Sequence, residues 1–322
     1  MTQPADDTSA RAAARLAWTR TALADDGITL ERASMDAGFR SYWRTLGHAD
    51  GSVIVMDSPP DKEDVRPWLR IRDLLEGGGV RVPRVLARDV DAGFLLLEDL
   101  GTRTCLQVID ADNADALFDA AFDQLLRLQA IAPPADLPAY DEALLARELR
   151  LFDEWFLGRH LGLSLDCGDM EVLELAYRRL VDAALAQPRV LVHRDFMPRN
   201  LMPVDDTPDH SMLAVLDFQD AVRGPIAYDV LSLFKDAFLS WPEERVTGWV
   251  ARYHARAAQA GLPVLICHGS ADPIVPISMA RNSQHSLEAL GLRPAFRTYP
   301  MAHAMCNEEI VDIANFIHAC LK

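Results

Sequence analysis

The sequence contains His193-Arg194-Asp195-Phe196-Met197-Pro198-Arg199-Asn200 directly after the apolar run Val190-Leu191-Val192. A second apolar run, Leu213-Ala214-Val215-Leu216, leads into Asp217-Phe218-Gln219-Asp220. Short apolar runs bounded by polar residues are typical of buried strands. We therefore predict two strands, each followed by a loop that carries acidic side chains.

The residue types in these loops suit phosphoryl transfer, which needs an aligned acceptor hydroxyl and neutralised phosphate charge more than covalent help. Asp195 can accept the hydroxyl proton, while Asn200 and Asp217 can offer hard oxygen ligands to Mg²⁺. A single acid after a strand can simply cap a turn. Together with His193, however, these residues match H-x-D-x-x-x-x-N followed by strand-Asp, the catalytic pattern of kinase-like enzymes.

A third motif follows closely as Gly224-Pro225-Ile226-Ala227-Tyr228-Asp229-Val230 and opens an apolar helix. Asp229 can be an acid in a first helical turn, where the helix dipole favours negative charge. Beside a catalytic loop it can instead brace the backbone of that loop, and we favour this role. We assign the same supporting role to His193.

The region before these motifs has the texture of a small antiparallel sheet. A leading helix over about residues 8–25 precedes strand-like runs between Ile28 and Asp57, with a hairpin turn at Asp50-Gly51. A helix with Asp61 as its N-cap ends at Gly77-Gly78-Gly79, and two further strands follow.

After Gly101 the apolar residues recur at helical spacing. One stripe holds Phe118, Phe122, Leu125 and Leu128, and a later stripe holds Leu149, Phe152, Phe156 and Leu157. We predict an α+β, bilobal protein-kinase-like fold. A small antiparallel-sheet N-lobe spans residues 1–100, and a helical C-lobe with the catalytic loop spans residues 101–262.

The net charge and composition indicate which kinds of partner the protein can bind. The 322 residues carry a formal charge of −16, which argues against nucleic acid and anionic membranes as partners. The five cysteines are scattered, and no apolar run is long enough to span a bilayer. We expect a cytoplasmic protein with free thiols and a small-molecule partner; the sequence leaves the oligomeric state open.

Longer strings carry a resemblance to a known family. They are Leu191–Met202, Val215–Ala221, Met56–Pro60 and Glu154–Gly162. These strings resemble the bacterial N-acetylmuramate/N-acetylglucosamine anomeric kinases of the aminoglycoside phosphotransferase/choline kinase superfamily, over about residues 8–262. The resemblance implies ATP and Mg²⁺ as cofactors and phosphorylation of the C1 hydroxyl of an amino sugar in cell-wall recycling. Two alternatives stay open: an aminoglycoside or amino-alcohol kinase, and a nucleotide-binding protein inactivated by its truncated C-lobe.

The resemblance also implies roles for individual residues. Asp195 would be the base, Asn200 and Asp217 would bind metal and nucleotide, and the backbone of Glu98-Asp99-Leu100 would meet adenine. For the acceptor pocket we predict Asp195, Gln219 or Asp220, and Glu148. The alternative for Glu148 is a side chain that simply faces solvent.

One feature departs from kinases at large, because Val53-Ile54-Val55-Met56 offers no lysine to the phosphates. The anomeric kinases that the chain resembles share this Met-Asp. We predict that Arg40 and Arg44, next to Asp36-Ala37-Gly38-Phe39, meet the phosphate charge, with Lys62 less favoured. The alternative is that these arginines are solvated charges.

The last part of the sequence changes in texture. Residues 263–322 read as strand, helix, strand and helix, and resemble the C-terminal fragment of an α/β-hydrolase carboxylesterase. There Asp272 and His303 would be the acid and base of a Ser-His-Asp triad. The nucleophile motif G-x-S-x-G is missing from the sequence. We therefore predict an appended α/β fragment without esterase activity, in place of helices that pack the C-lobe in relatives.

Overall fold

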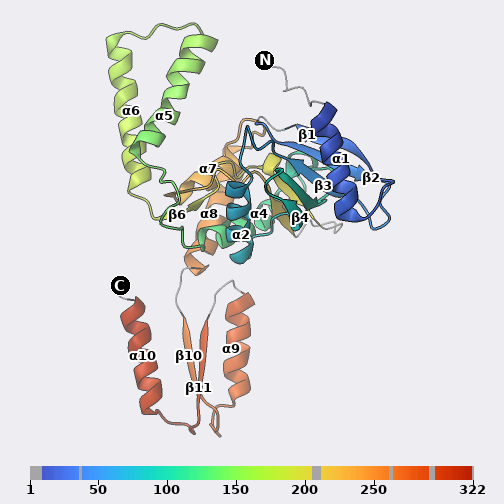
Figure 1. Ribbon diagram of the computed structural model, residues 1–322. Helices are drawn as coiled ribbons and strands as arrows, with labels where there is room; N and C mark the ends of the chain where they lie inside the picture. Colours follow the sequence, from blue (N-terminus) through green and yellow to red (C-terminus); the bar gives the residue numbers. More distant parts are fainter. Residues whose placement is uncertain (1–8, 36–37, 205–211, 261–263, 290–293, 321–322) are drawn as a thin grey trace. The chain divides into compact units, whose positions relative to one another are not determined.

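The computed structural model describes residues 9–35, 38–204, 212–260, 264–289 and 294–320 (Figure 1). The chain forms two compact units, Met1–Trp241 and Pro242–Lys322. The domain boundaries that we place at residues 100 and 262 remain predictions. Among the described helices, none is long and apolar enough to cross a membrane.

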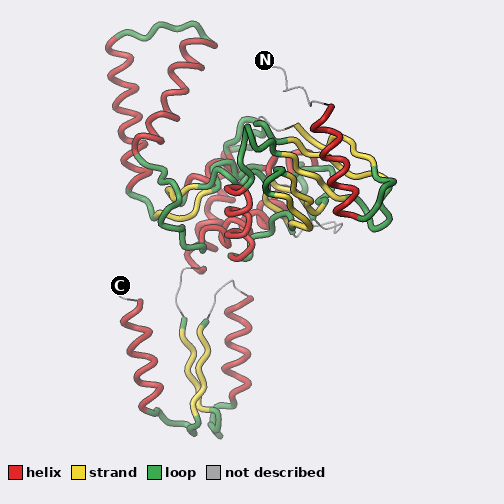
Figure 2. Tube along the Cα trace, viewed as in Figure 1, coloured by secondary structure: helices red, strands yellow, loops and turns green. Residues whose placement is uncertain are grey.

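After its leading helix, the first unit contains the predicted antiparallel sheet, drawn in yellow in Figure 2. Its five strands have the order β1-β2-β3-β5-β4. Each neighbouring pair is antiparallel. The turn between β2 and β3 contains Gly51 at φ 100°, a conformation that glycine adopts without steric cost. The strands are β1 Thr29–Met35, β2 Ser41–Leu46, β3 Val53–Asp57, β4 Val85–Asp89 and β5 Phe94–Glu98.

Helix α2, Arg66–Gly77, is the helix predicted within this lobe, and its apolar stripe is buried. It ends as predicted, since Gly78 is the C-cap and Gly79 has φ 80°. The predicted N-cap was wrong. The helix begins five residues after Asp61, where Asp64 Oδ1 accepts the N–H of Arg66 at 3.0 Å.

Helix α1, Ser9–Leu23, is joined to the sheet by a buried acid at the end of β3. Arg11 donates two hydrogen bonds to Asp57 Oδ1, at 2.9 and 2.7 Å, and Arg15 donates one to Oδ2 at 2.8 Å. The Arg15 and Asp57 side chains are only 3% and 2% exposed. Asp57 therefore ties the leading helix to the sheet instead of facing a ligand.

The C-lobe is largely helical, and the predicted stripe of α4 is buried. Two short ladders, β6 with β9 and β7 with β8, carry the loops that hold the catalytic motifs. The elements are α3 Cys105–Val108, α4 Ala114–Gln129, α5 Glu142–Leu151, the π-helix η1 Phe152–His160, α6 Cys167–Leu185, β6 Arg189–Val192, the 3₁₀ turn η2 Pro198–Asn200, β7 Leu201–Pro203, β8 Leu213–Val215, β9 Val222–Pro225 and α7 Ala227–Phe234.

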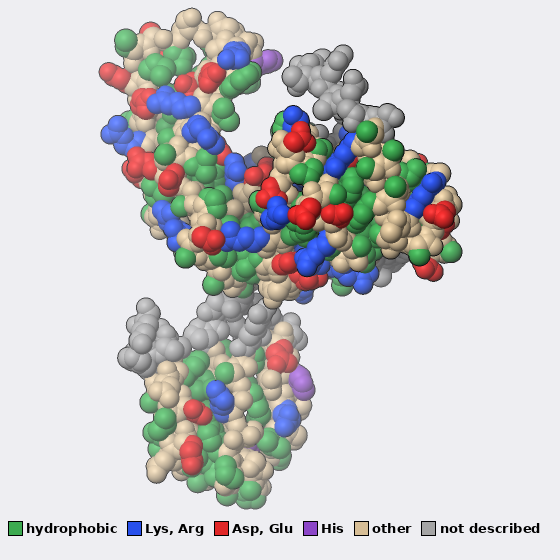
Figure 3. All heavy atoms as spheres, in the orientation of Figure 1, with side chains coloured by type: hydrophobic (Ala, Val, Ile, Leu, Met, Phe, Trp, Pro, Cys, Tyr) green, Lys and Arg blue, Asp and Glu red, His purple; other side chains and the backbone are tan. Residues whose placement is uncertain are grey.

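Helices α5 and α6 form a hairpin that extends away from the rest of the first unit (Figure 1). The second predicted stripe lies here, and half of it is exposed, with Phe152 at 47% and Phe156 at 46%. Leu149 and Leu157 are half-buried. The rings of Phe152, Phe156 and His160 stack in sequence along η1. Figure 3 shows apolar side chains over this hairpin. The exposed large ones are Leu151, Phe152, Trp155, Phe156, Leu161, Leu163, Val172, Leu175 and Leu180.

The second unit has the predicted strand and helix texture. Strands β10 and β11 are parallel and paired from Leu265–Ala295 to Gly269–Tyr299, with α9 and α10 packed on β10. Parallel strands need a crossover connection, which α9 supplies. The elements are α8 Glu243–Ala260, β10 Leu265–Gly269, α9 Ile277–Ala289, β11 Ala295–Tyr299 and α10 Asn307–Cys320.

We predict that Asp57→Asn lowers the free energy of unfolding by about 3–5 kcal/mol, because it leaves the positive charges of Arg11 and Arg15 without their acid. Urea unfolding followed by tryptophan fluorescence would measure the change. Asp91→Asn is the matched control, since Asp91 is 96% exposed in its ion pair with Arg66. We expect this control to stay within about 0.5 kcal/mol of wild type. Equal small losses in both variants would contradict the prediction.

Candidate active site

A cavity of about 360 Å³ lies between the sheet and the loops that follow β6 and β8. Ile54 and Leu97 of the sheet line one side of this cavity. Residues Glu98–Gly101, which connect the two lobes, line it as well. Asn200 and Asp217 line the opposite side. The structure therefore brings the predicted adenine-binding segment and both predicted metal ligands to one cavity.

The imidazole of His193 forms hydrogen bonds with both loops, the one that follows β6 and the one that follows β8. Its Nε2 donates to the carbonyl oxygen of Leu216 at 2.9 Å, and its Nδ1 accepts the N–H of Asp195 at 3.2 Å. These two bonds require a neutral ring with its proton on Nε2. Burial lowers the pKa of His193 to about 4, which keeps the ring neutral.

The carboxylate of Asp229, in the first turn of α7, accepts hydrogen bonds from the backbone of the loop that follows β6. Its Oδ2 accepts the N–H of His193 at 2.8 Å, and its Oδ1 accepts the N–H of Arg194 at 3.0 Å. Burial raises the pKa of Asp229 to about 7, although the two N–H donors act in the opposite direction. These are the contacts that the predicted bracing role requires.

The loop backbone is strained at two positions. Arg194 has φ 81° and Asp217 has φ 61°, in the left-handed region that non-glycine residues rarely adopt. Such conformations persist only where surrounding contacts determine them, and they cluster at functional sites. The bonds to Asp229 and Leu216 supply such contacts here.

The predicted catalytic residues lie on these neighbouring loops. Asn200 Nδ2 donates to the carbonyl oxygen of Asp195 at 2.9 Å, which fixes the orientation of the amide. Burial raises the pKa of Asp195, and the negative charge of Asp217 raises it further. Asp195 is thus linked to Asn200 through its backbone and to Asp217 through charge, while the catalytic roles of the three residues remain predictions.

The ligand chemistry of this set fits a hard divalent cation. Asn200 offers an amide oxygen and Asp217 a carboxylate, both preferred by Mg²⁺. No group of three or more His, Cys, Asp or Glu side chains in the described ranges is arranged to hold a metal. A cation at Asn200 and Asp217 would therefore take its remaining ligands from phosphate oxygens and water.

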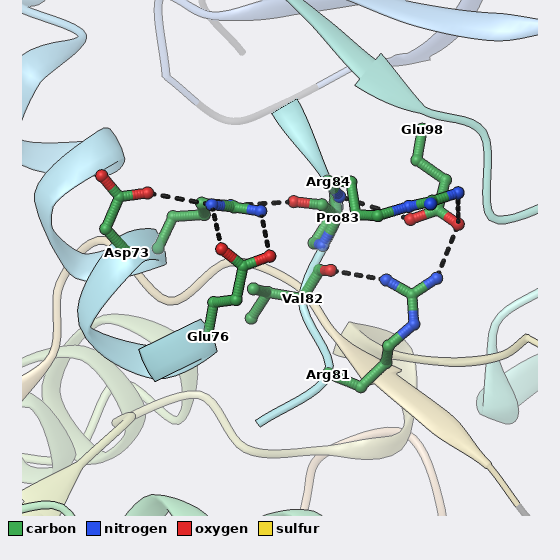
Figure 4. Close-up of polar contacts among 8 residues, drawn as sticks. Asp73, Glu76, Arg81, Val82, Pro83, Arg84 and Glu98 are labelled. Atoms are coloured by element: carbon green, nitrogen blue, oxygen red, sulfur yellow. Dashed lines mark hydrogen bonds and ion pairs between the residues drawn. The ribbon is translucent and has the colours of Figure 1, made fainter. Parts of the chain in front are cut away.

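The side chains of the connecting segment are held by arginines, as Figure 4 shows for Glu98. Glu98 accepts from Arg81 at 2.7 Å and from Arg84 at 3.2 Å. Burial raises the pKa of Glu98, but these hydrogen bonds outweigh it and the net shift is downward. The charged Glu98 side chain is thus fixed by arginines, and its backbone N–H donates to the carbonyl oxygen of Arg84 at 2.9 Å. Contact between the backbone of this segment and a base remains a prediction.

The same close-up shows how the chain before β4 is anchored. Arg81 donates to the carbonyl oxygen of Val82 at 2.7 Å, and Arg72 of α2 donates to that of Pro83 at 3.1 Å (Figure 4). Arg72 also forms an ion pair with Glu76 at 2.6 Å. The segment therefore has a defined position relative to α2 and β5.

The arginines predicted to meet the phosphates are already paired. Arg40 is only 7% exposed, pairs with Glu63 at 3.1 Å and does not line the cavity. Arg44 lines the cavity but pairs with Asp99 at 2.6 Å. Lys62 pairs with Asp61 at 3.5 Å. Their phosphate-binding role remains a prediction, and Asp36 and Ala37 of the neighbouring turn lie outside the described residues.

Arg199 is a charged cavity residue that the sequence reasoning missed. It lines the cavity beside Asn200. The available signal was its place within the predicted catalytic loop, immediately before a predicted metal ligand.

The predicted acceptor residues lie next to the catalytic set but not on the wall of this cavity. Gln219 Nε2 donates to Asp217 Oδ1 at 2.9 Å and to Asp220 Oδ2 at 3.2 Å. Glu148 accepts from Arg194 at 2.8 Å, from Tyr228 Oη at 3.2 Å and also from Tyr140 Oη. Contact of these residues with an acceptor remains a prediction.

In the second unit, the two residues predicted to be the acid and base of a hydrolase triad lie side by side. Asp272 Oδ2 and His303 Nδ1 lie 2.8 Å apart. Burial raises the pKa of Asp272, but donors that include the N–H of Val275 and His303 lower it to about 2. Since G-x-S-x-G is absent from the sequence, this pair has no serine of that motif to activate.

We predict that His193 makes stability depend on pH in a defined direction. Its pKa is lowered from 6.5 to about 4, so the unfolded chain takes up a proton in this range and the folded protein does not. The stabilisation is complete above pH 6.5 and falls by about 3 kcal/mol as the pH approaches 4.

The test is the free energy of unfolding of wild type and His193→Gln between pH 4 and 7. The difference between the two proteins should shrink as the pH falls. ¹⁵N NMR of the wild-type imidazole at pH 6 should show a neutral ring protonated on Nε2. A difference that is constant with pH, or a charged ring at pH 6, would contradict the prediction.

Two families match the chain, and the first match extends beyond the boundary between the two units. Residues 29–265 match the phosphotransferase enzyme family, and residues 250–321 match the phospholipase/carboxylesterase family. The chain is 48% identical over 264 residues to the N-acetylmuramate/N-acetylglucosamine kinase of Pseudomonas putida, covering 82% of this chain and 75% of that protein. It is 51% identical to the same-named kinase of Pseudomonas aeruginosa, covering 72% of this chain and 67% of that protein.

The terminal segment is 39% identical over 62 residues to acyl-protein thioesterase 1 of Debaryomyces hansenii, covering 19% of this chain and 27% of that protein. Among solved structures, the GDP complex of aminoglycoside 2'-phosphotransferase-IIIa aligns with a TM-score of 0.53 at 19% identity, covering 74% of this chain and 82% of that chain. This likeness confirms the predicted kinase-like fold. Residues 250–321 are similar to phospholipases and carboxylesterases. Because the family match spans residues 29–265, the chain belongs to the phosphotransferase enzyme family.

Proposed function

We propose that the protein transfers the γ-phosphoryl group of ATP to the anomeric C1 hydroxyl of N-acetylmuramate or N-acetylglucosamine. The observation that carries the reaction is the set Asp195, Asn200 and Asp217 on neighbouring loops, the last two at a cavity that also reaches the connection between the lobes. The substrate class rests on the relatives from two Pseudomonas species, which carry this name.

The cavity suits a nucleotide. Its volume of about 360 Å³ is within the range of small-molecule sites, and apolar side chains such as Ile54, Leu97 and Phe218 can flank a flat base. The backbone of Glu98–Leu100 would meet the edge of adenine. The phosphates would then extend toward Asn200 and Asp217, which lie on the opposite wall.

Asp195 would align the acceptor hydroxyl and accept its proton as the sugar oxygen bonds to the γ-phosphorus. The bond between that phosphorus and the bridging oxygen breaks, and ADP leaves. Asn200 and Asp217 would hold Mg²⁺, which supplies positive charge at the phosphate oxygens when bound. His193 and Asp229 would keep the Asp195 backbone in place, because they bond to residues 193–195.

A second candidate is a nucleotide-binding protein without turnover. The apolar hairpin α5–η1–α6 is exposed, and a quarter of the P. putida relative has no counterpart in the match. An acceptor pocket that needs a covering segment would then be incomplete. This candidate predicts nucleotide binding without sugar-dependent ADP release.

The test is Mg²⁺-dependent ADP release with a panel of acceptors: N-acetylmuramate, N-acetylglucosamine, an aminoglycoside and choline. We expect turnover with an amino sugar and none with its methyl glycoside, whose C1 hydroxyl is blocked. Asp195→Asn should lower kcat by about 100-fold or more, because it removes the proton acceptor. Since the pKa of Asp195 is raised, wild-type activity should fall on the acid side as this group is protonated.

Asp91→Asn serves again as the matched control, since this exposed acid lies outside the cavity. Its kcat should equal that of wild type. Turnover of the methyl glycoside would contradict the C1 assignment. Binding of ADP without turnover of any acceptor would contradict the kinase proposal and favour the second candidate.

A further inference from the structure

The cavity presents an electrostatic problem for a polyphosphate. Its lining includes the acids Glu98, Asp99 and Asp217, and the first two already balance the charges of nearby arginines. Strand β3 ends in Met56-Asp57 and offers no lysine. Asp57 forms ion pairs with Arg11 and Arg15 of α1, so the charges of these two arginines are already balanced. A triphosphate in this cavity needs a cationic side chain from elsewhere.

Within the described part of the chain, only two basic residues line the cavity, Arg44 and Arg199. Arg44 is already engaged. Its Nε and Nη2 donate to Asp99 at 2.6 and 3.0 Å, and Nη2 also donates to the carbonyl oxygen of Gly101 at 2.7 Å. Moving Arg44 to a phosphate would break these bonds and leave Asp99 without its charged partner.

Arg199 is in a different situation. Its side chain is exposed, and no acid of the described ranges pairs with its guanidinium. The guanidinium lies over the ring of Phe238, 5.0 Å from its centroid. This contact supports one side of the planar group and leaves its N–H donors for a ligand.

The backbone at Arg199 is fixed by its neighbours. The N–H of Asn200 donates to Met197 at 2.8 Å, and the carbonyl oxygen of Asn200 accepts from Leu216 at 2.9 Å. With the bond from Asn200 Nδ2 to Asp195, these contacts define the 3₁₀ turn that carries Arg199. The backbone that carries the Arg199 side chain is therefore fixed next to a predicted metal ligand.

We propose that Arg199 binds the terminal phosphates of the nucleotide and supplies the positive charge that β3 lacks. The proposal rests on the proposed function for nucleotide binding at this cavity. A guanidinium can donate two parallel hydrogen bonds to phosphate oxygens, which a lysine ammonium cannot reproduce. In this arrangement the catalytic loop provides both the proton acceptor and a phosphate clamp.

The test is calorimetric titration of ADP, AMP and adenosine into full-length wild type, Arg199→Ala and Arg199→Lys. Arg199→Ala should weaken ADP binding by about 10-fold or more, the loss expected for a charge-assisted hydrogen bond. Adenosine affinity should stay within about twofold, since the base pocket is untouched. Arg199→Lys should fall between wild type and Arg199→Ala.

Arg66→Ala is the matched control, because it removes the same charge from an arginine that is 62% exposed and does not line the cavity. Its ADP affinity should match that of wild type. ADP affinity unchanged in Arg199→Ala, or adenosine affinity lost to the same extent as ADP affinity, would overturn the assignment of Arg199. Wild type that binds no ADP would overturn the proposed function itself.

Discussion

A single buried carboxylate determines the geometry on which the candidate site depends. Asp229 is fully buried and accepts the backbone N–H groups of His193 and Arg194. Its raised pKa reflects the desolvation of this acid, and the two N–H donors offset part of that cost. Because the acid holds main-chain atoms, it sets the path of the loop whatever side chain follows. Arg194 can then occupy an unfavourable φ, and Asp195 lies close enough to Asp217 for that charge to raise the Asp195 pKa.

The sequence predicted those parts of the fold whose causes are local. Alternating and helical periodicity gave the sheet and α4, and His193, Asp195 and Asn200 lie within a few residues of one another. Distant ion pairs were not predictable in this way. Arg44 and Asp99 are 55 residues apart, and Arg11 and Asp57 are 46 apart, so neither spacing reveals the pair. Arg44 therefore appeared as a free phosphate ligand, although its charge is balanced by the acid of the neighbouring segment.

In the second unit, an acid and a histidine pair without the serine motif that would accompany them in a hydrolase. Asp272 follows β10 and His303 follows β11, so the pairing of two parallel strands is sufficient to bring them together. The geometry depends only on this small sheet and its adjoining loops. Ion pairing between an acid and a histidine is thus a poor indicator of hydrolysis when the sequence supplies no serine in the required turn.

The hairpin of α5, η1 and α6 has a consequence for the life of the protein in a cell. It displays nine large apolar side chains, and patches of this kind promote self-association and attract chaperones and proteases. Quality control acts on such a surface whatever the protein catalyses. We therefore expect this pair of helices to influence the abundance and half-life of the chain more than the loop that carries Asp195 does.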